Sequence, residues 1–338
     1  MDKNIVNVAL FGLGRIGQMH AENLVSHPKF KLISVYDINK DLSKKFSKKF
    51  KCLNIENPNI AMKDKKTDVI FIATSTSTHL KFIEEAVKNK KIVFCEKPLD
   101  LNLEKIEKCK RKIKKYNPKI QIGFNRRYDP GHKLLRKNLL KGKIGKLEKI
   151  IITSRDPSPP SIDYLKISGG IFKDMMIHDF DLARYYVGKD EFEAIFATGS
   201  NLHDKKFNKI KDFELASCVL KTKKGIQCII TNSRHCSFGY DQRVELFGTK
   251  GMLISDNKRE SETIFYSGNS TNNKSKLLNF FIERYSEAYK LQLEDLFMMY
   301  SKNHKPLANF EDGRKSLAIA QKAILSVKSK KFEKIKLI

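Results

Sequence analysis

Two short segments carry side chains that can move a proton. The first is the Glu-Lys-Pro of residues 96–98, in which the ammonium of Lys97 can hydrogen-bond a substrate oxygen. The second is an apolar stretch of helical period in which Asp174 and His178 stand four apart, a spacing that predicts one shared helix face. Asp181 follows three residues later and can share that side. For residues 96–98 the alternative is a plain surface turn, and for His178 it is a histidine on a helix surface. The presence of both segments favours a catalytic site.

A glycine-rich segment near the N-terminus predicts a nucleotide site. In "VALFGLGRIGQMHAENL", Gly12, Gly14 and Gly17 directly follow an apolar run and precede a helical pattern. The first glycine permits a tight turn, the second lets backbone approach a pyrophosphate, and the third lets the helix pack on the strand. Arg15 and Ile16 lie between these glycines and are predicted to contact the cofactor with them.

The acid that would bind the adenosine ribose is Asp37, at the end of the apolar run "KLISVYD" and 20 residues beyond Gly17. A carboxylate there accepts hydrogen bonds from the ribose hydroxyls of NAD and repels the extra phosphate of NADP. An ordinary aspartate at a turn is the alternative. Lys40, three residues on, is a candidate phosphate partner that keeps some NADP use open.

The elements that must position these residues differ between the two halves of the chain. From Ile5 to Phe124, apolar runs alternate with amphipathic stretches, which predicts a doubly wound parallel sheet. The expected strands are "IVNVALF", "KLISVYD", "DVIFIAT", "KIVFCE" and "KIQIGF". The strand "KIVFCE" would deliver Lys97 to the carboxyl edge of the sheet, where ligands bind in such folds.

After Phe124 we expect one helix from about Gly170 to Val187 and then strands of an antiparallel sheet. Those strands are "ELASCVLKT", "GIQCIITNS", "RVELFGT" and "GMLISD", and the segment from about Ser275 to Lys328 is again helical in period. The predicted fold class is therefore α/β. A Rossmann domain covers residues 1–123, and an α+β domain built on an open, mostly antiparallel sheet covers residues 124–338, with the last helices able to pack back on the first domain.

Composition narrows the possible partners. The formal net charge is +28, but 54 of the 66 basic residues are lysines spread along the chain, whereas nucleic-acid readout favours clustered arginine. We therefore expect no nucleic-acid partner. The six cysteines form no CxxC pair, which predicts reduced, mostly buried thiols and no zinc site. No long apolar run predicts a membrane span, so we expect a cytoplasmic protein.

Nearly from end to end, the chain resembles the Gfo/Idh/MocA oxidoreductases. The glycine-rich segment, the Glu-Lys-Pro and the Asp-x-x-x-His carry the resemblance. More narrowly, four segments look like those of inositol 2-dehydrogenases: "GFNRRYDP", "SRDPSPP", "SGGIFKDMMIHDFDLAR" and "GYDQRVELFGTKG". The resemblance implies a Rossmann domain followed by an open-faced sheet domain, which supplies the substrate pocket and the oligomer interface, commonly in a tetramer.

The same resemblance implies that Lys97, Asp174 and His178 form the catalytic group. His178 would take the hydroxyl proton as a hydride passes to the nicotinamide, because a neutral imidazole has a pKa near the working pH. Asp174 would orient the polyol or tune the proton transfer, and Lys97 would polarise the oxygen that becomes a carbonyl. Glu96 would hold the Lys97 ammonium or the neighbouring backbone, beside the cofactor. Whether Lys97 or His178 first receives the proton stays open.

Further residues are expected to face the substrate. Arg127 in "NRRYD" and Tyr240 in "GYDQ" match positions that would contact hydroxyls. Arg155 and Asp156, in the loop "SRDPSPP", should line the entrance of the same substrate pocket. The alternative is that this segment is a stiff surface loop. Asp181 completes this set. The loop lacks the histidine that some inositol dehydrogenases carry there, which leaves the preferred cyclitol open.

These observations predict an NAD-dependent dehydrogenase of inositol catabolism that oxidises myo-inositol at C2 to 2-keto-myo-inositol (scyllo-inosose). One alternative is another cyclitol or sugar dehydrogenase of the same fold. From a different class, the alternative is a non-catalytic NAD-binding sensor, in which loss of Lys97 and His178 would be expected. Metal is not required, because these two residues can polarise the substrate oxygen. The expected partners are a small polyol and further copies of the chain, most simply as a homotetramer.

Overall fold

A computed structural model describes residues 5–337 of the chain. Its contacts divide the chain into two compact units. The first consists of Met1–Tyr128 with Glu287–Arg314, and the second of Asp129–Ser286 with Lys315–Ile338. Each unit is therefore built from two separate stretches of chain. The predicted boundary between residues 123 and 124 remains a prediction.

The first unit holds a six-stranded sheet in the order β3-β2-β1-β4-β5-β6, and all of its strand pairs are parallel. This confirms the predicted doubly wound sheet. Its elements are β1 (Val6–Phe11), α1 (Arg15–Ser26), β2 (Phe30–Tyr36), α2 (Lys40–Phe50), β3 (Leu53–Asn54), α3 (Pro58–Lys63), β4 (Val69–Ile72), α4 (Thr76–Lys88), β5 (Ile92–Cys95), α5 (Leu103–Ile113), η1 (Lys114–Tyr116), β6 (Ile120–Ile122), η2 (Asn125–Tyr128) and α12 (Ser286–Lys302).

Helices cover both faces of this parallel sheet, which explains why its strands are apolar throughout. Leu10 and Phe11 are neighbours on β1, so their side chains point to opposite faces. Leu10 belongs to a buried cluster that includes Leu24 of α1 and Leu296 of α12. The Phe11 ring packs edge-on against Phe82 of α4 at 5.4 Å. Both faces are therefore closed to water.

The second unit holds a seven-stranded mixed sheet in the order β12-β11-β7-β10-β9-β8-β15. Its pairs are antiparallel except for β7 with β10, which run parallel. Its elements are α6 (Pro130–Leu140), β7 (Leu147–Arg155), α7 (Ile162–Ser168), α8 (Gly170–Asp174), α9 (Ile177–Val187), β8 (Phe192–Ser200), α10 (Lys206–Lys209), β9 (Leu215–Thr222), β10 (Gln227–Ser233), β11 (Asp241–Gly248), β12 (Gly251–Ser255), β13 (Ile264–Ser267), β14 (Ser270–Lys274), α11 (Phe281–Arg284), α13 (Phe310–Ser329) and β15 (Glu333–Lys334).

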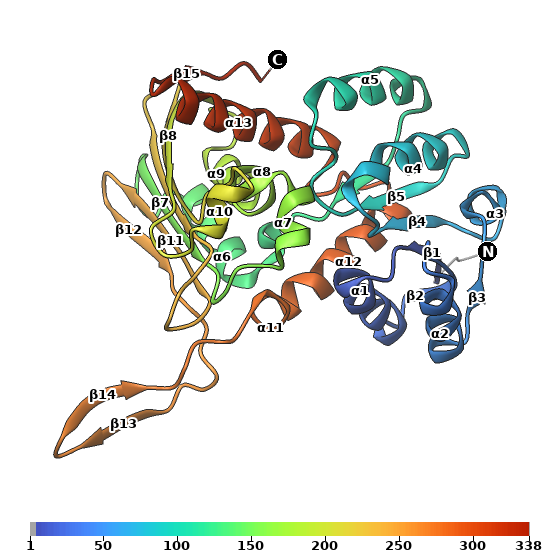
Figure 1. The fold of residues 1–338 in the computed structure, drawn as a ribbon, viewed down its shortest axis with the longest axis horizontal. Coiled ribbons are helices and arrows are strands. Elements are labelled where there is room, and N and C mark those ends of the chain that lie inside the picture. The colour runs from blue at the N-terminus through green and yellow to red at the C-terminus, as the bar shows by residue number, and fades with distance from the viewer. Residues whose placement is uncertain (1–4, 338) are drawn as a thin grey trace. The chain divides into compact units, whose positions relative to one another are not determined.

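One face of this sheet packs against helices of the same unit (Figure 1), and residues of α6, α8, α9 and α13 share its buried cluster. The opposite face is open. Along β9, buried residues alternate with more exposed ones, as expected for a sheet with one covered face. Cys218 and Leu220 point into the core, whereas Val219 between them is 39% exposed. This confirms the predicted open, mostly antiparallel sheet.

The single helix predicted from about Gly170 to Val187 is wrong. The segment forms two helices, α8 and α9, separated by Met175 and Met176. The N–H of Met176 bonds to the carbonyl of Ile171, five residues back, which interrupts the regular helical ladder. Asp174 therefore ends one helix and His178 belongs to the first turn of the next, so the sharing of one helix face no longer follows from their spacing.

A hairpin that the sequence reading did not predict extends from the strands of the second unit (Figure 1). It consists of β13 and β14, which pair with each other as a separate two-stranded sheet. Its residues Ile264, Phe265 and Tyr266 are 42%, 60% and 63% exposed.

The cysteines are mostly buried, as predicted. Five of the six are buried and Cys52 is half-buried.

Candidate active site

The glycine-rich loop of the first unit has the geometry of a phosphate site. Gly12 lies at φ +91°, and a Cβ there would meet the carbonyl oxygen of Ala73 at 2.4 Å. A Cβ on Gly17 would meet the carbonyl oxygen of Gly12 at 2.0 Å, so this position also requires glycine. At Gly14 a Cβ would meet nothing within 4 Å. Backbone at the start of α1 is thus open to a ligand, and the predicted roles of the three glycines fit the dinucleotide phosphates.

The two residues between these glycines lie at the beginning of α1. Arg15 is its first residue and is exposed, and Ile16 is half-buried. No acidic side chain occurs in the first turn of the helix, so the positive end of the helix dipole is not neutralised there. Their predicted contacts with the cofactor remain predictions.

Asp37 follows β2 and ties two loops together. One of its carboxylate oxygens accepts a hydrogen bond from the N–H of Leu13 in the glycine-rich loop at 2.6 Å. The other accepts from the N–H of Asn39 at 2.8 Å. Asp37 therefore joins the loop between β2 and α2 to the glycine-rich loop. An adenosine ribose would lie beside this carboxylate.

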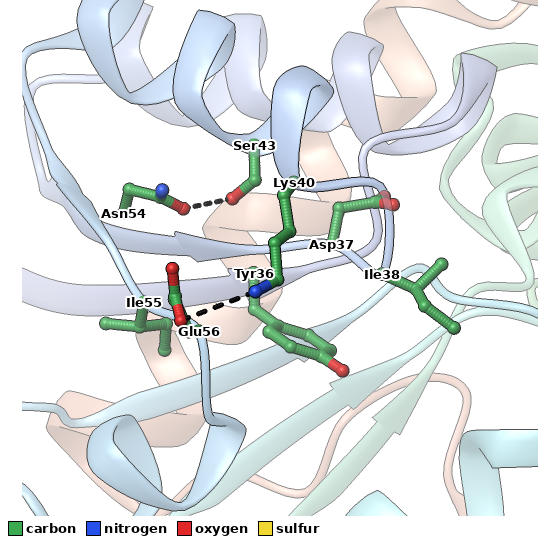
Figure 2. A pocket seen from close by; sticks show the side chains of 8 residues that line it. All are labelled: Tyr36, Asp37, Ile38, Lys40, Ser43, Asn54, Ile55 and Glu56. Atoms are coloured by element: carbon green, nitrogen blue, oxygen red, sulfur yellow. Dashed lines mark hydrogen bonds and ion pairs between the residues drawn. The ribbon is translucent and has the colours of Figure 1, made fainter.

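A small pocket opens beside Asp37 (Figure 2). Its lining residues are Tyr36, Asp37, Ile38, Lys40, Ser43, Asn54, Ile55 and Glu56. The Nζ of Lys40 lies 3.6 Å from Glu56 Oε2. Lys40, the candidate phosphate partner, is thus paired with an acid. Ile38 is 91% exposed and offers an apolar surface at the rim.

Lys97 stands two residues beyond the end of β5. Its neighbours Glu96 and Pro98 are buried, whereas Lys97 itself is half-buried. The backbone N–H of Lys97 donates a hydrogen bond to Glu96 Oε2 at 3.2 Å. Of the two predicted tasks of Glu96, the structure therefore supports holding the backbone.

In the second unit, Asp174 is buried and bonded at both carboxylate oxygens. The hydroxyl of Tyr164 donates to one oxygen at 2.8 Å, and the guanidinium of Arg234 donates to the other at 3.1 Å. Arg234 is 1% exposed. Burial acts to lower the pKa of Arg234, but the carboxylates of Asp174, Asp212 and Asp156 outweigh it and raise that pKa above its usual value. Asp174 is thus an anion held beside a permanent cation.

The start of α9, which carries His178, is fixed by its neighbour Asp179. This buried carboxylate accepts from the Ser154 hydroxyl at 2.7 Å and from the Asn232 amide at 2.8 Å. Ser154 and Asn232 are register partners on the parallel strands β7 and β10. His178 is half-buried and Asp181, also predicted to face the site, is 1% exposed. The helix is therefore anchored at the carboxyl ends of two adjacent parallel strands.

The other predicted substrate residues of the second unit lie near those strand ends. Arg155, the last residue of β7, donates to Asp241 at 2.6 Å. The N–H of Asp156 bonds to the carbonyl of Ser233 at the end of β10. Tyr240 is buried at 5% exposure. Arg155, Asp156 and Tyr240 are thus ordered, and their contacts with a substrate stay predictions.

Arg127 lies in the first unit. It is 6% exposed and donates to the carbonyl of Leu307 at 2.5 Å and to Asp312 at 3.0 Å. These bonds tie η2 to the C-terminal stretch of the first unit. The predicted contact of Arg127 with substrate hydroxyls remains untested.

The chain resembles known proteins over nearly its full length. Residues 6–124 match the family model described as "Oxidoreductase family, NAD-binding Rossmann fold", and residues 132–254 match the "GFO/IDH/MocA C-terminal domain". The chain belongs to the GFO/IDH/MocA family. It is therefore an NAD-binding oxidoreductase, as its glycine-rich loop and Asp37 predicted.

Several members of this GFO/IDH/MocA family align closely with the chain. The myo-inositol 2-dehydrogenase of Thermotoga maritima is 39% identical over 98% of each chain, and the inositol 2-dehydrogenase of Rhizobium meliloti is 36% identical over 96% of this chain and 98% of that protein. Among solved structures, a myo-inositol dehydrogenase from Corynebacterium glutamicum has a TM-score of 0.94 at 36% identity, covering 98% of this chain and 99% of its own. A scyllo-inositol dehydrogenase from Lactobacillus casei, solved with NAD(H) and scyllo-inositol, has a TM-score of 0.90 at 25% identity, covering 98% and 99%.

Within this GFO/IDH/MocA chain, sequence reasoning missed Arg234 and Tyr164, the two residues that hold Asp174. The one local signal for Arg234 is its place directly after β10, in "CIITNSR", where a strand end would bring it to the sheet edge.

Among residues 5–337 no group of three or more His, Cys, Asp and Glu side chains could hold a metal ion. Over the same residues, none of the helices combines the length and the hydropathy that a membrane span requires.

Proposed function

We propose that this oxidoreductase is an NAD-dependent inositol 2-dehydrogenase, which oxidises myo-inositol at C2 to 2-keto-myo-inositol. The observation that carries the proposal is the similarity to inositol dehydrogenases at 36–39% identity, which extends over 96–98% of the chain. It therefore includes the second unit, where Asp174 and His178 lie, as well as the cofactor unit. Similarity confined to the Rossmann unit would have supported NAD binding alone.

The chemistry requires a hydroxyl to lose its proton while the carbon loses a hydride. NAD, when bound, accepts that hydride. If His178 takes the hydroxyl proton, Lys97 acts as an ammonium that hydrogen-bonds the oxygen as it becomes a carbonyl. If Lys97 takes the proton, it does so as a neutral amine and the ammonium so formed makes that hydrogen bond. Asp174, held as an anion by Arg234 and Tyr164, stabilises positive charge that develops on His178 or accepts a bond from a neighbouring hydroxyl.

A ring polyol suits these residues better than a hydroxy acid. A carboxylate substrate calls for an arginine free to form two parallel bonds with it. In the second unit, Arg234 is committed to Asp174, and Arg155 donates to Asp241. Asp174 and Asp181 would repel an acid, whereas carboxylates can accept bonds from several hydroxyls of one ring. This argument supports a polyol without choosing among stereoisomers, so another cyclitol or sugar remains the alternative substrate.

A substrate panel tests the proposal. We expect purified enzyme with NAD to form NADH, followed at 340 nm, with myo-inositol, more slowly with scyllo-inositol or a pyranose, and not with lactate or malate. A site that pairs each hydroxyl can discriminate epimers by factors of about 10⁴. His178→Ala serves as the matched inactive control. Turnover of a hydroxy acid alone, or of no cyclitol or sugar, would overturn the proposal.

We further propose that the enzyme is a cytoplasmic homotetramer of inositol catabolism, assembled through the open face of the second unit's sheet. One row of register partners crosses that face: Phe196, Val219, Ile229, Ile151, Glu245 and Ile254. Five of these six are apolar, and Ile254 is 55% exposed. An apolar stripe of this kind marks an interaction surface.

Sedimentation velocity tests the assembly. The expected result is a tetramer for the wild type and smaller species for Val219→Glu, which places a charge between Phe196 and Ile229 in the stripe. Val219→Leu, which keeps the surface apolar, is the matched control. A wild-type monomer, or a Val219→Glu tetramer, would contradict the proposed interface.

A further inference from the structure

A buried histidine on the cofactor-loop helix reaches the segment that carries Lys97. His20 lies on α1 and is 1% exposed. Its Nε2 lies 2.7 Å from Glu96 Oε1. Its ring packs against those of Phe71, Phe94 and Tyr289, with centroid distances of 4.6, 5.4 and 5.6 Å. The ring is therefore fixed on its faces and edges, and it presents one nitrogen to Glu96.

Glu96 has little freedom to leave this contact. Its second oxygen accepts the N–H of Lys97 at 3.2 Å, as described above. On another side lies Gly123, where an added Cβ would stand only 2.6 Å from Glu96 Oε2. The carboxylate thus links the His20 ring to the peptide nitrogen of Lys97 within a closely packed space.

A second buried histidine reaches the other neighbour of Lys97. His79, on α4, is 1% exposed. Its Nδ1 lies 2.8 Å from the carbonyl oxygen of Pro98, and its Nε2 lies 3.0 Å from that of Thr74. Thr74 follows β4 and Pro98 follows β5, which are adjacent parallel strands. A neutral imidazole donates one hydrogen, to one of these carbonyls at a time.

We propose that His20 and His79 are a pair of positioning residues that fix Lys97 from both of its peptide neighbours. His20 acts through the Glu96 carboxylate and His79 through the Pro98 carbonyl, so neither needs to touch substrate. The inference rests on the proposed role of Lys97 in turnover. Its physical basis is that a displacement of about 1 Å in a reacting group can cost about 10²-fold in rate.

Aromatic and amide replacements separate the nitrogen contacts from packing. His20→Phe and His79→Phe keep a buried ring but remove the nitrogens. We expect kcat to fall by about 10- to 100-fold, with little change in the KM for inositol and in the NADH affinity measured by fluorescence titration. His20→Gln restores a donor to Glu96 and should recover part of the loss. The control is His27→Phe, because His27 also contacts a carboxylate, Glu294 at 3.0 Å, in the same unit.

Coupling to Lys97 distinguishes positioning from general damage. In a Lys97→Ala background, His20→Phe and His79→Phe should lower kcat little further, because the group they position is gone. Full additive losses in that background, or wild-type kcat in both single histidine variants, would overturn the inference. A fall in NADH affinity equal to the fall in kcat would do the same, since it would place the defect in the cofactor site.

The outcome separates this inference from the proposed function. If Lys97→Ala itself turns over inositol at near the wild-type rate, the role of Lys97 fails and the inference fails with it. If Lys97→Ala is inactive while both histidine variants keep wild-type kcat, only the inference fails. Thermal unfolding of each variant, read by circular dichroism, ensures that rates are compared between folded proteins.

Discussion

The guanidinium of Arg234 lies 3.1 Å from the carboxylate of Asp174, and both groups are buried. Opposite charges taken out of water stabilise each other only while both remain, so removing one leaves a buried charge without its counterpart. The pair belongs to the second unit and joins Asp174, a proposed catalytic residue that the sequence analysis named, to Arg234, which the sequence analysis did not name. Arg234 therefore fixes both the charge and the orientation of Asp174.

We predict that Arg234→Gln lowers the free energy of unfolding by about 3–5 kcal/mol and lowers kcat/KM for inositol at least as severely as Asp174→Asn. Urea unfolding and NADH formation measure the two effects. Arg243→Gln is the matched control, because the Arg243 side chain is 44% exposed and its partner Asp241 keeps Arg155. Equal stability of Arg234→Gln and wild type would show that the pair is not needed.

We predict that Lys97→Ala and His178→Ala each fold and bind NADH but lose about 10²- to 10⁴-fold in kcat. Both groups are proposed to handle the hydroxyl proton, which contributes to turnover and not to cofactor affinity. Asp174→Asn should lose turnover too, by a smaller factor. Steady-state kinetics and fluorescence titration check this. Near-normal turnover in either alanine variant removes that residue from the proposed chemistry.

We predict a preference for NAD over NADP that Asp37 enforces. Like charges placed together cost several kcal/mol, so removing this carboxylate should lower the ratio of kcat/KM values for the two cofactors by about 10². Asp37→Asn and Asp37→Ala separate two effects, because asparagine can still accept the Leu13 N–H bond. Asparagine should relax cofactor choice with less loss of NAD affinity. Equal use of NAD and NADP by the wild type would contradict the placement of Asp37.

We predict that Asp129 stabilises the second unit at neutral pH and loses this contribution in acid. Burial acts to raise the pKa of Asp129, but His132, Arg284 and Lys258 outweigh it, and the pKa is lowered below its ordinary value of 3.8. Arg284 donates to the carboxylate at 2.6 Å. Because the pKa is lowered in the folded state, the stabilisation is complete above about pH 4 and disappears as pH falls through the folded-state value.

The test compares wild type with Asp129→Asn, which keeps an acceptor at the start of α6. The difference in the free energy of unfolding should be present at about pH 5 and shrink below about pH 4. Urea titrations read by circular dichroism at several pH values measure it. A difference that persists unchanged at pH 2.5 would show that the charge of Asp129 is not its cause.

The parallel sheet and the glycine-rich loop of the first unit were predictable because their sequence signals are local. Strands covered on both faces read as continuous apolar runs, and the required glycines follow from a tight turn and a close helix approach that leave no room for a Cβ. The second unit depends more on partners distant in sequence. The sequences of β7 and β10 do not indicate that these strands pair in parallel. This pairing brings Ser154 and Asn232 to Asp179.

Two other features that the sequence analysis missed, the break between α8 and α9 and the role of Arg234, also depend on tertiary packing. Met175 and Met176 are ordinary helix formers, and residues 171–180 contain no glycine or proline to signal a break, so the packing of the unit decides that α8 ends before α9 begins. Arg234 is one of 12 arginines in a strongly basic chain, and only its burial beside Asp174 separates it from a surface residue.

Because the first unit is completed by residues 287–314, it cannot reach its final form while the ribosome has made only its first stretch. Gln121 donates to the carbonyl of Gln292, and the Tyr128 hydroxyl donates to Asp295, across sequence separations of 171 and 167 residues. At about 5–20 residues per second, the missing helix follows roughly 10–30 s later. During this interval the nascent cofactor unit exposes polar groups and apolar surface that α12 later covers, so we expect stable NAD binding only after α12 has been synthesised.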